Sequence, residues 1–384
     1  MIITRQLLEQ IEDQTLAPYG MRSRDTIGRE YPDNEPEYRT AFQRDRDRII
    51  HTTAFRRLEY KTQVFNNFEG DYFRTRLTHT LEVAQVGRTI ARALGANEDL
   101  IEAICLAHDL GHAAFGHSGE ATLNELLKDH GGYDHNKQSF RIVTKLERRF
   151  PNWPGLNLTW EVREGIVKHE TEYDISDATD FNPELRGNLE AQIANIADEL
   201  AYTTHDLDDG LRSGMIHHEM FSNLGLWKQV IESVGWDGKG EMSELLRHQI
   251  IRRLVGILIS DVLEATNARI EAAGAKSVLD IQQLEHNVIG YSDSLLPLNK
   301  ELKSFLFKNL YNHPRVRGMA EHARNALITI FRAYVAKPEM LPPDFQATIP
   351  SRGLERAVCD YIAGMTDRFA EQENNRLKGS TSLP

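Results

Sequence analysis

The sequence predicts an all-α protein, and three observations carry this prediction. No proline occurs between Pro36 and Pro151 or between Pro183 and Pro297, so long helices can form there without a break. Apolar residues recur at three- and four-residue spacings through several segments, which is the period of an α-helix. Alternating runs joined by hairpin turns, the pattern of strands, are scarce. We therefore expect a helical bundle with additional helices towards the C-terminus.

Two segments show the helical period most clearly, residues 76–94 and residues 188–211. The apolar positions that share a spacing in the first segment are Leu77, Leu81, Ala84, Ile90 and Leu94. Those of the second segment are Ile193, Ile196, Ala197, Leu200 and Ala201. Helices are expected to break at residues 149–157, 177–187 and 272–277, where proline, glycine or polar residues gather.

We expect the chain to have four parts. Residues 1–50 form an N-terminal arm with the first helices, and residues 51–215 form the core. Residues 216–370 form a C-terminal helical region that packs on the core. Residues 371–384 are a polar tail, which we expect to be frayed.

Composition excludes several classes of protein. A hydrophobic content of 40% and a charged content of 27% are ordinary for a globular protein. The longest apolar runs, such as residues 254–260, are too short to span a bilayer, and the N-terminus has no basic region followed by an apolar segment. Cys105 and Cys359 are the only cysteines, which excludes a disulfide framework and predicts a cytoplasmic location. A net charge of -12 disfavours a surface that attracts nucleic acid throughout.

Residues 106–124 carry the densest group of ionisable side chains. His108, Asp109, His112, His117 and Glu120 lie within 13 positions, interleaved with Leu, Gly, Ala and Phe. We expect His108 and His112 about 6 Å apart on one helical face, then a break, then His117 and Glu120 one turn apart. A single histidine is usually a surface or core residue, but burying this many ionisable groups is costly unless a metal or a polyanion compensates them. The segment therefore predicts a metal or catalytic site.

Two further helices add residues of the same kinds. His79 lies on the amphipathic segment 76–94, and Asp198 lies within the apolar stripe of segment 188–211. Tyr202 and Asp206 follow Asp198 at four and eight residues, so a continuous helix would present all three on one face. Imidazole and carboxylate ligands suit manganese, iron, zinc or nickel, and the absence of cysteine ligands argues against a structural zinc site.

With these residues the sequence resembles the HD-domain metal phosphohydrolases, through His79, His108–Asp109 and Asp198. A longer match, over residues 20 to 365, is to the bacterial deoxyguanosinetriphosphate triphosphohydrolase-like proteins. The segments that carry it are residues 53–65, 74–85, 107–120, 135–143 and 197–210, with a weaker match at 302–316. The motif "HDLGHAAFGHSGE" is highly specific to this branch.

The resemblance implies a fold and a reaction. The HD fold would hold one divalent metal ion, manganese, iron, nickel or zinc, with magnesium as a substitute in assays. The ligands would be His79, His108, Asp109 and Asp198. The reaction would be hydrolysis of a deoxynucleoside triphosphate, dGTP or several dNTPs, to a deoxynucleoside and inorganic triphosphate by attack of water on the α-phosphorus.

The resemblance also implies roles around the triphosphate. His117, with Glu120 one turn on, matches the acid–base pair of the family. His112 and His135 match histidines that face the triphosphate, and His112 is counted among the catalytic residues. Some relatives have an acid after the residue that corresponds to His135. This chain has Asn136 there, and we assign that residue no catalytic role.

Substrate contacts follow from the same positions. Gln63 and Asp206 match residues that hydrogen-bond the 3′-hydroxyl, and Tyr202 matches the ring that occupies the place of a 2′-hydroxyl. Arg76 matches an arginine at the phosphates or the base. Two further substrate residues, Lys303 and Tyr311, keep a spacing of eight residues seen in relatives.

Several alternatives stay open at this point. The chain is compatible with another HD phosphohydrolase, such as a 5′-nucleotidase or a cyclic-nucleotide phosphodiesterase, with a non-enzymatic nucleotide sensor, and with a nucleic-acid-binding regulator. The resemblance implies a homo-oligomer, a tetramer or a hexamer, and an activating nucleotide or single-stranded DNA as further partners. The preferred base is not readable from these residues.

Overall fold

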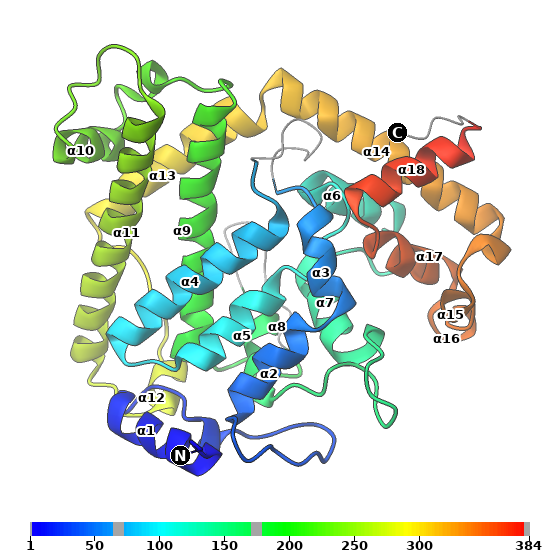
Figure 1. The fold of residues 1–384 in the computed structure, drawn as a ribbon, viewed down its shortest axis with the longest axis horizontal. Coiled ribbons are helices and arrows are strands. Elements are labelled where there is room, and N and C mark those ends of the chain that lie inside the picture. The colour runs from blue at the N-terminus through cyan, green and yellow to red at the C-terminus, as the bar shows by residue number, and fades with distance from the viewer. Residues whose placement is uncertain (1, 64–72, 170–178, 380–384) are drawn as a thin grey trace. The chain divides into compact units, whose positions relative to one another are not determined.

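The computed structural model describes residues 2–63, 73–169 and 179–379. These residues form α-helices joined by turns, with isolated β-bridges and no strand among them, which confirms the all-α prediction. The chain divides into two compact units (Figure 1). The first unit comprises residues 1–49, 79–106 and 157–313, and the second comprises residues 50–78, 107–156 and 314–384.

Each unit is built from helices that are distant in sequence. Those wholly or mainly in the first unit are α1 (Arg5–Thr15), α2 (Ala41–Ile50), α4 (Arg76–Leu94), α5 (Glu98–His108), α8 (Trp160–Val167), α9 (Leu189–Arg212), α10 (Gly225–Ser233), α11 (Glu244–Ala273), α12 (Val278–Gln282) and α13 (Leu295–Leu306). Those of the second unit are α3 (Thr53–Arg57), α6 (Gly116–Leu126), α7 (His135–Arg141), α14 (Pro314–Ala336), α15 (Pro343–Gln346), α16 (Ile349–Arg352), α17 (Leu354–Ala363) and α18 (Asp367–Leu377).

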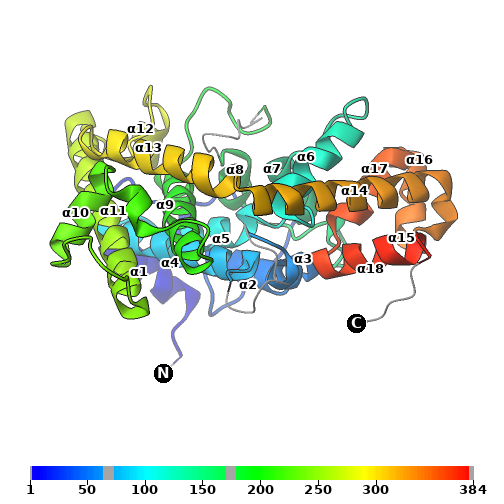
Figure 2. The same ribbon diagram turned by 90° about the horizontal axis from the view of Figure 1, so that it is seen from above.

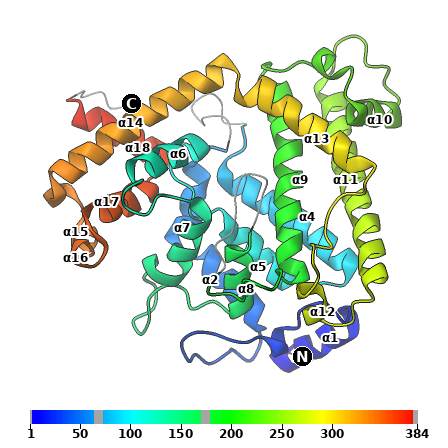
Figure 3. The same ribbon diagram turned by 180° about the vertical axis from the view of Figure 1, so that it is seen from behind.

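Helix α9 forms the centre of the first unit, where it packs on α8, α11, α12 and α13 (Figure 3). Asn188 caps its N-terminus by accepting a hydrogen bond from the Ala191 N–H at 2.8 Å. The five apolar residues predicted to line one face are all buried, which confirms that prediction. Because α9 is continuous to Arg212, the polar side chains on its other positions keep a regular spacing.

Helix α4 begins and ends where the periodicity predicted, but its buried face differs. Leu81 is 49% exposed, whereas Arg76, His79 and Thr80 are buried. The apolar prediction is therefore wrong at Leu81. The reason is that charged and polar side chains of α4 take interior positions where they are paired, and a paired charge can replace an apolar residue in a core.

Helix α14 organises the second unit, where it packs on α6, α17 and α18 (Figure 2). Its core includes the fully buried Leu123, Leu327, Ile330 and Ile362. The prediction of a frayed tail from residue 371 is wrong up to Leu377, because α18 continues to that residue. There the buried Glu373 accepts a hydrogen bond from the Tyr334 hydroxyl at 2.7 Å, which holds α18 against α14.

The loop predictions agree with the structure where it describes them. Residues 150–159 contain no helix, and α11 ends at Gly274, whose φ of 63° suits a residue without a Cβ atom. Of the break predicted at 177–187, residues 177 and 178 lie outside the described residues, and 179–187 form turns. In the part of the chain that the structure describes, no helix combines the length and apolar character that crossing a bilayer requires.

Candidate active site

The segment that follows α5 brings the first predicted residues together. Helix α5 ends at His108, so His108 and Asp109 lie at a helix end, where both side chains can serve one site. The His108 Nε2 lies 3.4 Å from the Asp109 Oδ1. The prediction that His112 shares a helical face with His108 is wrong, because residues 109–115 form a turn and the His112 N–H donates to the Asp109 carbonyl at 3.2 Å.

Gly111 lets the turn approach α7 closely. A Cβ atom there would lie 2.2 Å from the His135 carbonyl oxygen and 2.3 Å from the Ser139 nitrogen, so the turn touches the backbone of α7. The Ser139 hydroxyl donates to the His108 carbonyl at 2.6 Å and accepts from the Gly111 N–H at 2.8 Å. Helix α7, distant in sequence, therefore fixes the turn that carries the candidate residues.

Asp109 is a buried acidic residue within this turn. It is 3% exposed, and its two oxygens face Arg76 Nη1 at 2.9 Å and His112 Nε2 at 3.0 Å. Burial alone would raise the pKa of the Asp109 carboxyl, but Arg76, His108 and His112 outweigh it and hold that pKa well below its usual range. Burial and the neighbouring Arg76 in turn hold the pKa of His112 well below its usual range. The pair is thus an ionised carboxylate beside a neutral imidazole, the protonation states that metal ligation requires.

Glu120, on the first turns of α6, gathers three histidines. Its Oε1 lies 2.9 Å from His135 Nδ1 and accepts the His135 N–H at 2.8 Å. His117 Nδ1 is 3.7 Å and His112 Nδ1 is 3.9 Å from its Oε2. Burial would raise the pKa of Glu120, but hydrogen bonds with His117 and His135 lower it well below its usual range. Glu120 is therefore ionised and is bound more closely to His135 than to its expected partner His117.

The histidines of this group differ in exposure. The side chain of His117 is 74% exposed, whereas His112 and His135 are buried and their rings stack with centroids 3.9 Å apart. His117 can therefore exchange a proton with a bound molecule or with solvent. Two sets in this unit, Asp109–His112–His135 and His112–His117–Glu120, have ligand atoms within 4.8 Å of one another. This chemistry suits a transition metal or a phosphate chain.

In the first unit, α9 presents Asp198 to a histidine from α4. The His79 Nε2 lies 2.9 Å from the Asp198 Oδ1, and His79 is 1% exposed. His169 Nε2 lies 3.5 Å from the other Asp198 oxygen. Sequence reasoning missed His169, since a lone histidine at the end of α8 gives no pattern. Of the predicted ligand quartet, His79 and Asp198 thus belong to the first unit, and His108 and Asp109 to the second.

Four predicted substrate residues form contacts at the C-terminal half of α9, which carries two of them. The Tyr311 hydroxyl donates a hydrogen bond to the Asp206 carboxylate. The Lys303 Nζ lies 3.3 Å from a Glu199 oxygen and 5.7 Å from the centre of the Tyr202 ring. The weak match that suggested Lys303 and Tyr311 therefore names residues that contact the predicted sugar-binding side chains. His205, whose Nδ1 lies 3.2 Å from Glu82, was missed although it precedes Asp206.

Gln63 and Arg76 lie in the second unit. The Gln63 Oε1 is buried and has no hydrogen-bond partner among the described residues, as expected of a side chain that awaits a ligand. Arg76, besides holding Asp109, lies with its Nη2 3.4 Å from the Thr62 carbonyl oxygen. Arg76 thus links the segment before Gln63 to the turn after α5. The Asn136 Oδ1 is also buried without a partner among these residues.

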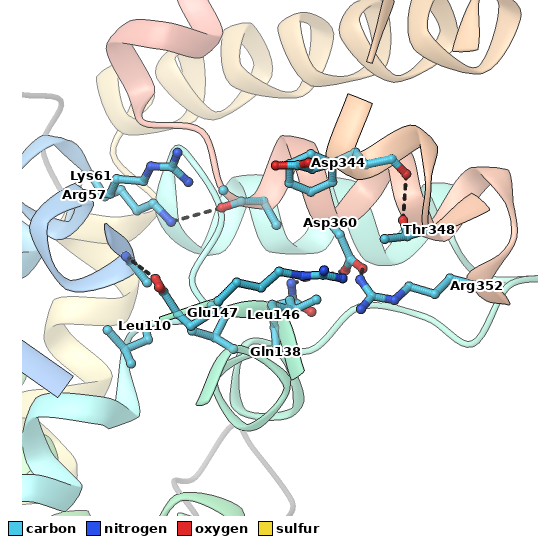
Figure 4. Close-up of a pocket in the computed structure, with 16 residues that line it drawn as sticks. Arg57, Lys61, Leu110, Gln138, Leu146, Glu147, Asp344, Thr348, Arg352 and Asp360 are labelled. Carbon is cyan, nitrogen blue, oxygen red and sulfur yellow. Dashed lines mark hydrogen bonds and ion pairs between the residues drawn. The ribbon is translucent and has the colours of Figure 1, made fainter. Parts of the chain in front are cut away.

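A cavity of about 230 Å³ lies behind the turn in the second unit (Figure 4). Its lining includes Arg57, Lys61, Leu110, Gln138, Arg352 and Asp360. Lys61 is 2% exposed, and its Nζ donates to the carbonyls of His112 and Ala363. Burial lowers the pKa of Lys61 to about 7. Sequence reasoning missed Lys61, because a single lysine in a motif carries no sign of its burial.

The chain is similar to known proteins over most of its length. The HD domain model matches residues 76–203, which contain the four predicted ligands, and the phosphohydrolase-associated domain model matches residues 289–376. The chain is similar to a deoxyguanosinetriphosphate triphosphohydrolase-like protein of Geobacter sulfurreducens, with 49% identity over 96% of this chain and 97% of the relative. Proteins of the same name from Deinococcus deserti and Ralstonia nicotianae are 48% and 47% identical, over 96% and 94% of this chain and 95% and 94% of their own lengths.

Proposed function

This chain belongs to the deoxyguanosinetriphosphate triphosphohydrolase-like proteins, which carry the HD phosphohydrolase domain, and we propose that it hydrolyses deoxynucleoside triphosphates to a deoxynucleoside and inorganic triphosphate. The observation that carries the proposal is the group formed by Asp109, His112, Glu120 and His135 with the exposed His117. It combines two ionised carboxylates, the neutral His112 imidazole and one exposed histidine ring. A polyanion with a scissile phosphoester bond suits such a group.

We assign the metal ligands to His79, Asp198, His108 and Asp109, as the family resemblance implies. The chain's residues fit this assignment: His79 and His108 are buried, and Asp109 is held ionised. When bound, a manganese, iron, nickel or zinc ion would supply a Lewis acid that polarises a phosphoryl oxygen and lowers the pKa of a bound water. The Asp109 carboxylate, which is already ionised, needs no proton release before it binds the ion.

The bond changes assign a role to His117. A water oxygen forms a bond to the α-phosphorus, the bond from that phosphorus to the ribose 5′ oxygen breaks, and the leaving oxygen takes a proton. The exposed His117 ring supplies that proton, and the proton lost by the attacking water passes to solvent. Glu120 lies 3.7 Å from His117 Nδ1 and 2.9 Å from His135 Nδ1, so its carboxylate orients both rings.

The α9 side chains set the preference for deoxyribose. Tyr202 would overlap a 2′-hydroxyl, while Asp206 accepts a hydrogen bond from the 3′-hydroxyl and is itself oriented by Tyr311. Gln63, whose buried Oε1 has no hydrogen-bond partner among the described residues, donates its amide N–H to the oxygen of the same hydroxyl. Steric exclusion by a ring discriminates more firmly than the loss of one contact.

A nucleotide panel tests the proposal. The four dNTPs, the four NTPs, nucleoside monophosphates and cyclic nucleotides are incubated with the metal-loaded protein, and triphosphate, pyrophosphate and phosphate are resolved. We expect free triphosphate from dNTPs and none from a His117→Ala control. Phosphate from monophosphates would instead establish a 5′-nucleotidase, and opening of cyclic nucleotides a phosphodiesterase. The preferred base, an activating nucleotide, single-stranded DNA, the tetramer or hexamer and a cytoplasmic location stay predictions.

A further inference from the structure

The turn that presents His117 has an unusual backbone. Phe115, which precedes α6, has φ of 65° and ψ of 24°, and Gly116 follows with φ of 56°. The left-handed region is strained for a residue with a Cβ atom. Phe115 makes no side-chain cap to α6, so this local geometry is not self-supporting. Contacts from elsewhere in the chain must hold it.

Asp367, the first residue of α18, supplies that contact. Its Oδ1 accepts the Phe115 N–H at 2.8 Å, and its Oδ2 accepts the Thr62 N–H at 2.8 Å and the Thr62 hydroxyl. The residue is 2% exposed. Hydrogen bonds to an ionised acceptor are roughly twice as strong as those between neutral groups. One buried carboxylate therefore joins two segments that are far apart in sequence.

We propose that Asp367 is a positioning residue for the hydrolysis: its carboxylate fixes the turn that presents His117 and, through Thr62, the segment that presents Gln63. This inference rests on the proposed function for its effect on turnover. Asp367 touches neither substrate nor reacting atoms. It acts through the backbone of residues 115 and 62.

The two segments also contact each other. A Cβ atom at Gly116 would lie 3.3 Å from the Thr62 carbonyl oxygen and 3.5 Å from that of Gln63. The Thr62 carbonyl oxygen lies 3.4 Å from Arg76 Nη2, and the Nη1 atom of the same guanidinium group donates to Asp109. A shift of Thr62 would thus disturb Gln63 directly and Asp109 through Arg76. The carboxylate of Asp367 holds Thr62, from which the link to Gln63 and the link through Arg76 to Asp109 both start.

Lys61 ties the same C-terminal segment to the turn from the cavity side. Its ammonium group donates to the His112 carbonyl and, at 3.0 Å, to the Ala363 carbonyl. Residues 363–367 are thus linked to the turn near both of its ends, to His112 through Lys61 and to Phe115 through Asp367. This segment lies within the match to the phosphohydrolase-associated domain, residues 289–376. Through these contacts, the segment matched by the phosphohydrolase-associated domain helps to hold the turn at residues 109–115 in place.

The test compares two buried carboxylates of α18 in the full chain. Asp367→Asn keeps the shape but replaces one acceptor oxygen by an amide that donates, so one backbone N–H loses its partner. Glu373→Gln is the matched control, because Glu373 is also buried but binds Tyr334 and Arg376 and neither segment. Thr62→Val, which removes only the hydroxyl, is a milder variant should Asp367→Asn not fold.

Amide hydrogen exchange gives a readout that does not depend on activity. We expect exchange at Phe115 and Thr62 to accelerate at least about tenfold in Asp367→Asn, less in Thr62→Val, and to stay unchanged in Glu373→Gln. Unchanged exchange at Phe115 in a folded Asp367→Asn protein, or equal acceleration in Glu373→Gln, overturns the proposal. If the wild-type protein hydrolyses no dNTP, the proposed function fails, while the exchange result still decides whether Asp367 holds the turn.

Turnover supplies the second readout. Asp367→Asn should lower kcat for dGTP by about tenfold or more, since small displacements of catalytic groups cost much of their effect. It should also narrow the preference for dGTP over 2′,3′-dideoxy-GTP, because Gln63 would lose its place at the 3′-hydroxyl. A general loss of folded protein would lower the turnover of both substrates by the same factor. Equal losses on the two substrates therefore contradict the positioning role.

Discussion

Helix α9 and the turn between α5 and α6 place their functional side chains by different means. On α9, Asp198, Tyr202 and Asp206 follow one another at every fourth residue of a continuous helix. In the turn, Asp109 and His112 lie between two helices, and a residue in the left-handed region precedes α6. The geometry of α9 comes from its own hydrogen bonds, whereas the turn depends on Ser139 and Asp367, which are distant in sequence.

The difference extends to charge. The turn buries Asp109 and His112 with Arg76, and their pKa values depart far from the usual range. The Asp198 carboxylate of α9 is less enclosed, with a side-chain exposure of 14%. Substitutions in the turn should therefore change the rate of the chemical step. Substitutions in the C-terminal half of α9 should change which substrate is accepted. The predictions below test that division.

The largest effect is expected where the division should fail, because we propose that metal ligands come from both regions. His108→Ala in the second unit and Asp198→Ala in the first should each abolish turnover and strip a stoichiometric metal, since each removes one of four ligands of one ion. Far-ultraviolet circular dichroism should show the helices retained. Elemental analysis of the purified proteins measures the metal.

The control for this experiment is His130→Ala, a change to an exposed histidine of the second unit near Glu355. It should keep metal and activity. Unchanged metal in a folded His108→Ala protein would remove His108 from the ligand set. Loss of metal from only one of the two ligand variants would mean that the two regions do not share one ion.

The second effect concerns the turn alone. His117→Ala should lower kcat by about 10²- to 10⁴-fold, the usual contribution of a general acid–base group. Metal content and dNTP affinity should stay near those of the wild type. His135→Ala gives the comparison, because Glu120 lies closer to His135 than to His117. A larger loss of kcat in His135→Ala, with metal retained, would transfer the proton-donating role to His135.

These two regions also differ in what the sequence could predict. The bounds of α4 and the buried stripe of α9 followed from apolar periodicity, which is a local property. The same rule failed at Leu81, because polar residues of α4 are paired in the interior. It also failed at His112, because α5 ends at His108 and residues 109–115 form a turn.

Residues that act over long sequence distances were not predictable. Lys61 and Asp367 lie 302 and 252 residues from the segments they join, Ala363 and Phe115. Nothing in the neighbourhood of either residue marks it as buried. His169 likewise reaches Asp198 only in the folded chain. The family resemblance supplied the candidate ligands and substrate residues, but not the contacts that hold the turn.

The third effect is on selectivity and belongs to α9. Tyr202→Ala should narrow the gap between dGTP and GTP, mainly by admitting GTP, because the ring no longer overlaps a 2′-hydroxyl. Asp206→Ala should weaken every 3′-hydroxyl substrate and affect 2′,3′-dideoxy-GTP much less. A change of about 10- to 100-fold in these ratios corresponds to about 1.4–2.7 kcal/mol. The measurement is kcat/KM for dGTP, GTP and dideoxy-GTP.

The structure adds a sharper control for that experiment. Tyr311→Phe keeps the ring but removes the hydroxyl that donates to Asp206. It should reproduce part of the Asp206→Ala effect and leave discrimination between dGTP and GTP unchanged. Equal losses on all three substrates in Tyr202→Ala and Asp206→Ala would mean that both residues only support the fold. In that case the sugar site is not on this face of α9.

The smallest effect is on stability, at most a tenfold change in the folding equilibrium per pH unit, or about 1.4 kcal/mol. Burial lowers the pKa of Lys61 in the folded protein to about 7, whereas an exposed lysine in the unfolded chain titrates at about 10.4. Between these values the unfolded chain binds one more proton than the folded protein. The contribution of Lys61 to stability is therefore present above about pH 10.4 and is lost as the pH falls through about 7.

Lys61→Met tests this linkage, because methionine fills a similar space without a titrating group. Urea unfolding at pH 7.5 and at pH 9.5 should show a rise in the free energy of unfolding of the wild type, relative to Lys61→Met, of up to about 2.7 kcal/mol. Lys128→Met, a change to an exposed lysine of the same unit, should keep the wild-type pH dependence. Parallel pH profiles of the wild type and Lys61→Met would show that the ammonium group is not enclosed behind the turn. The turn would then lack the contact through Lys61, which is one of the long-range contacts that distinguish it from α9.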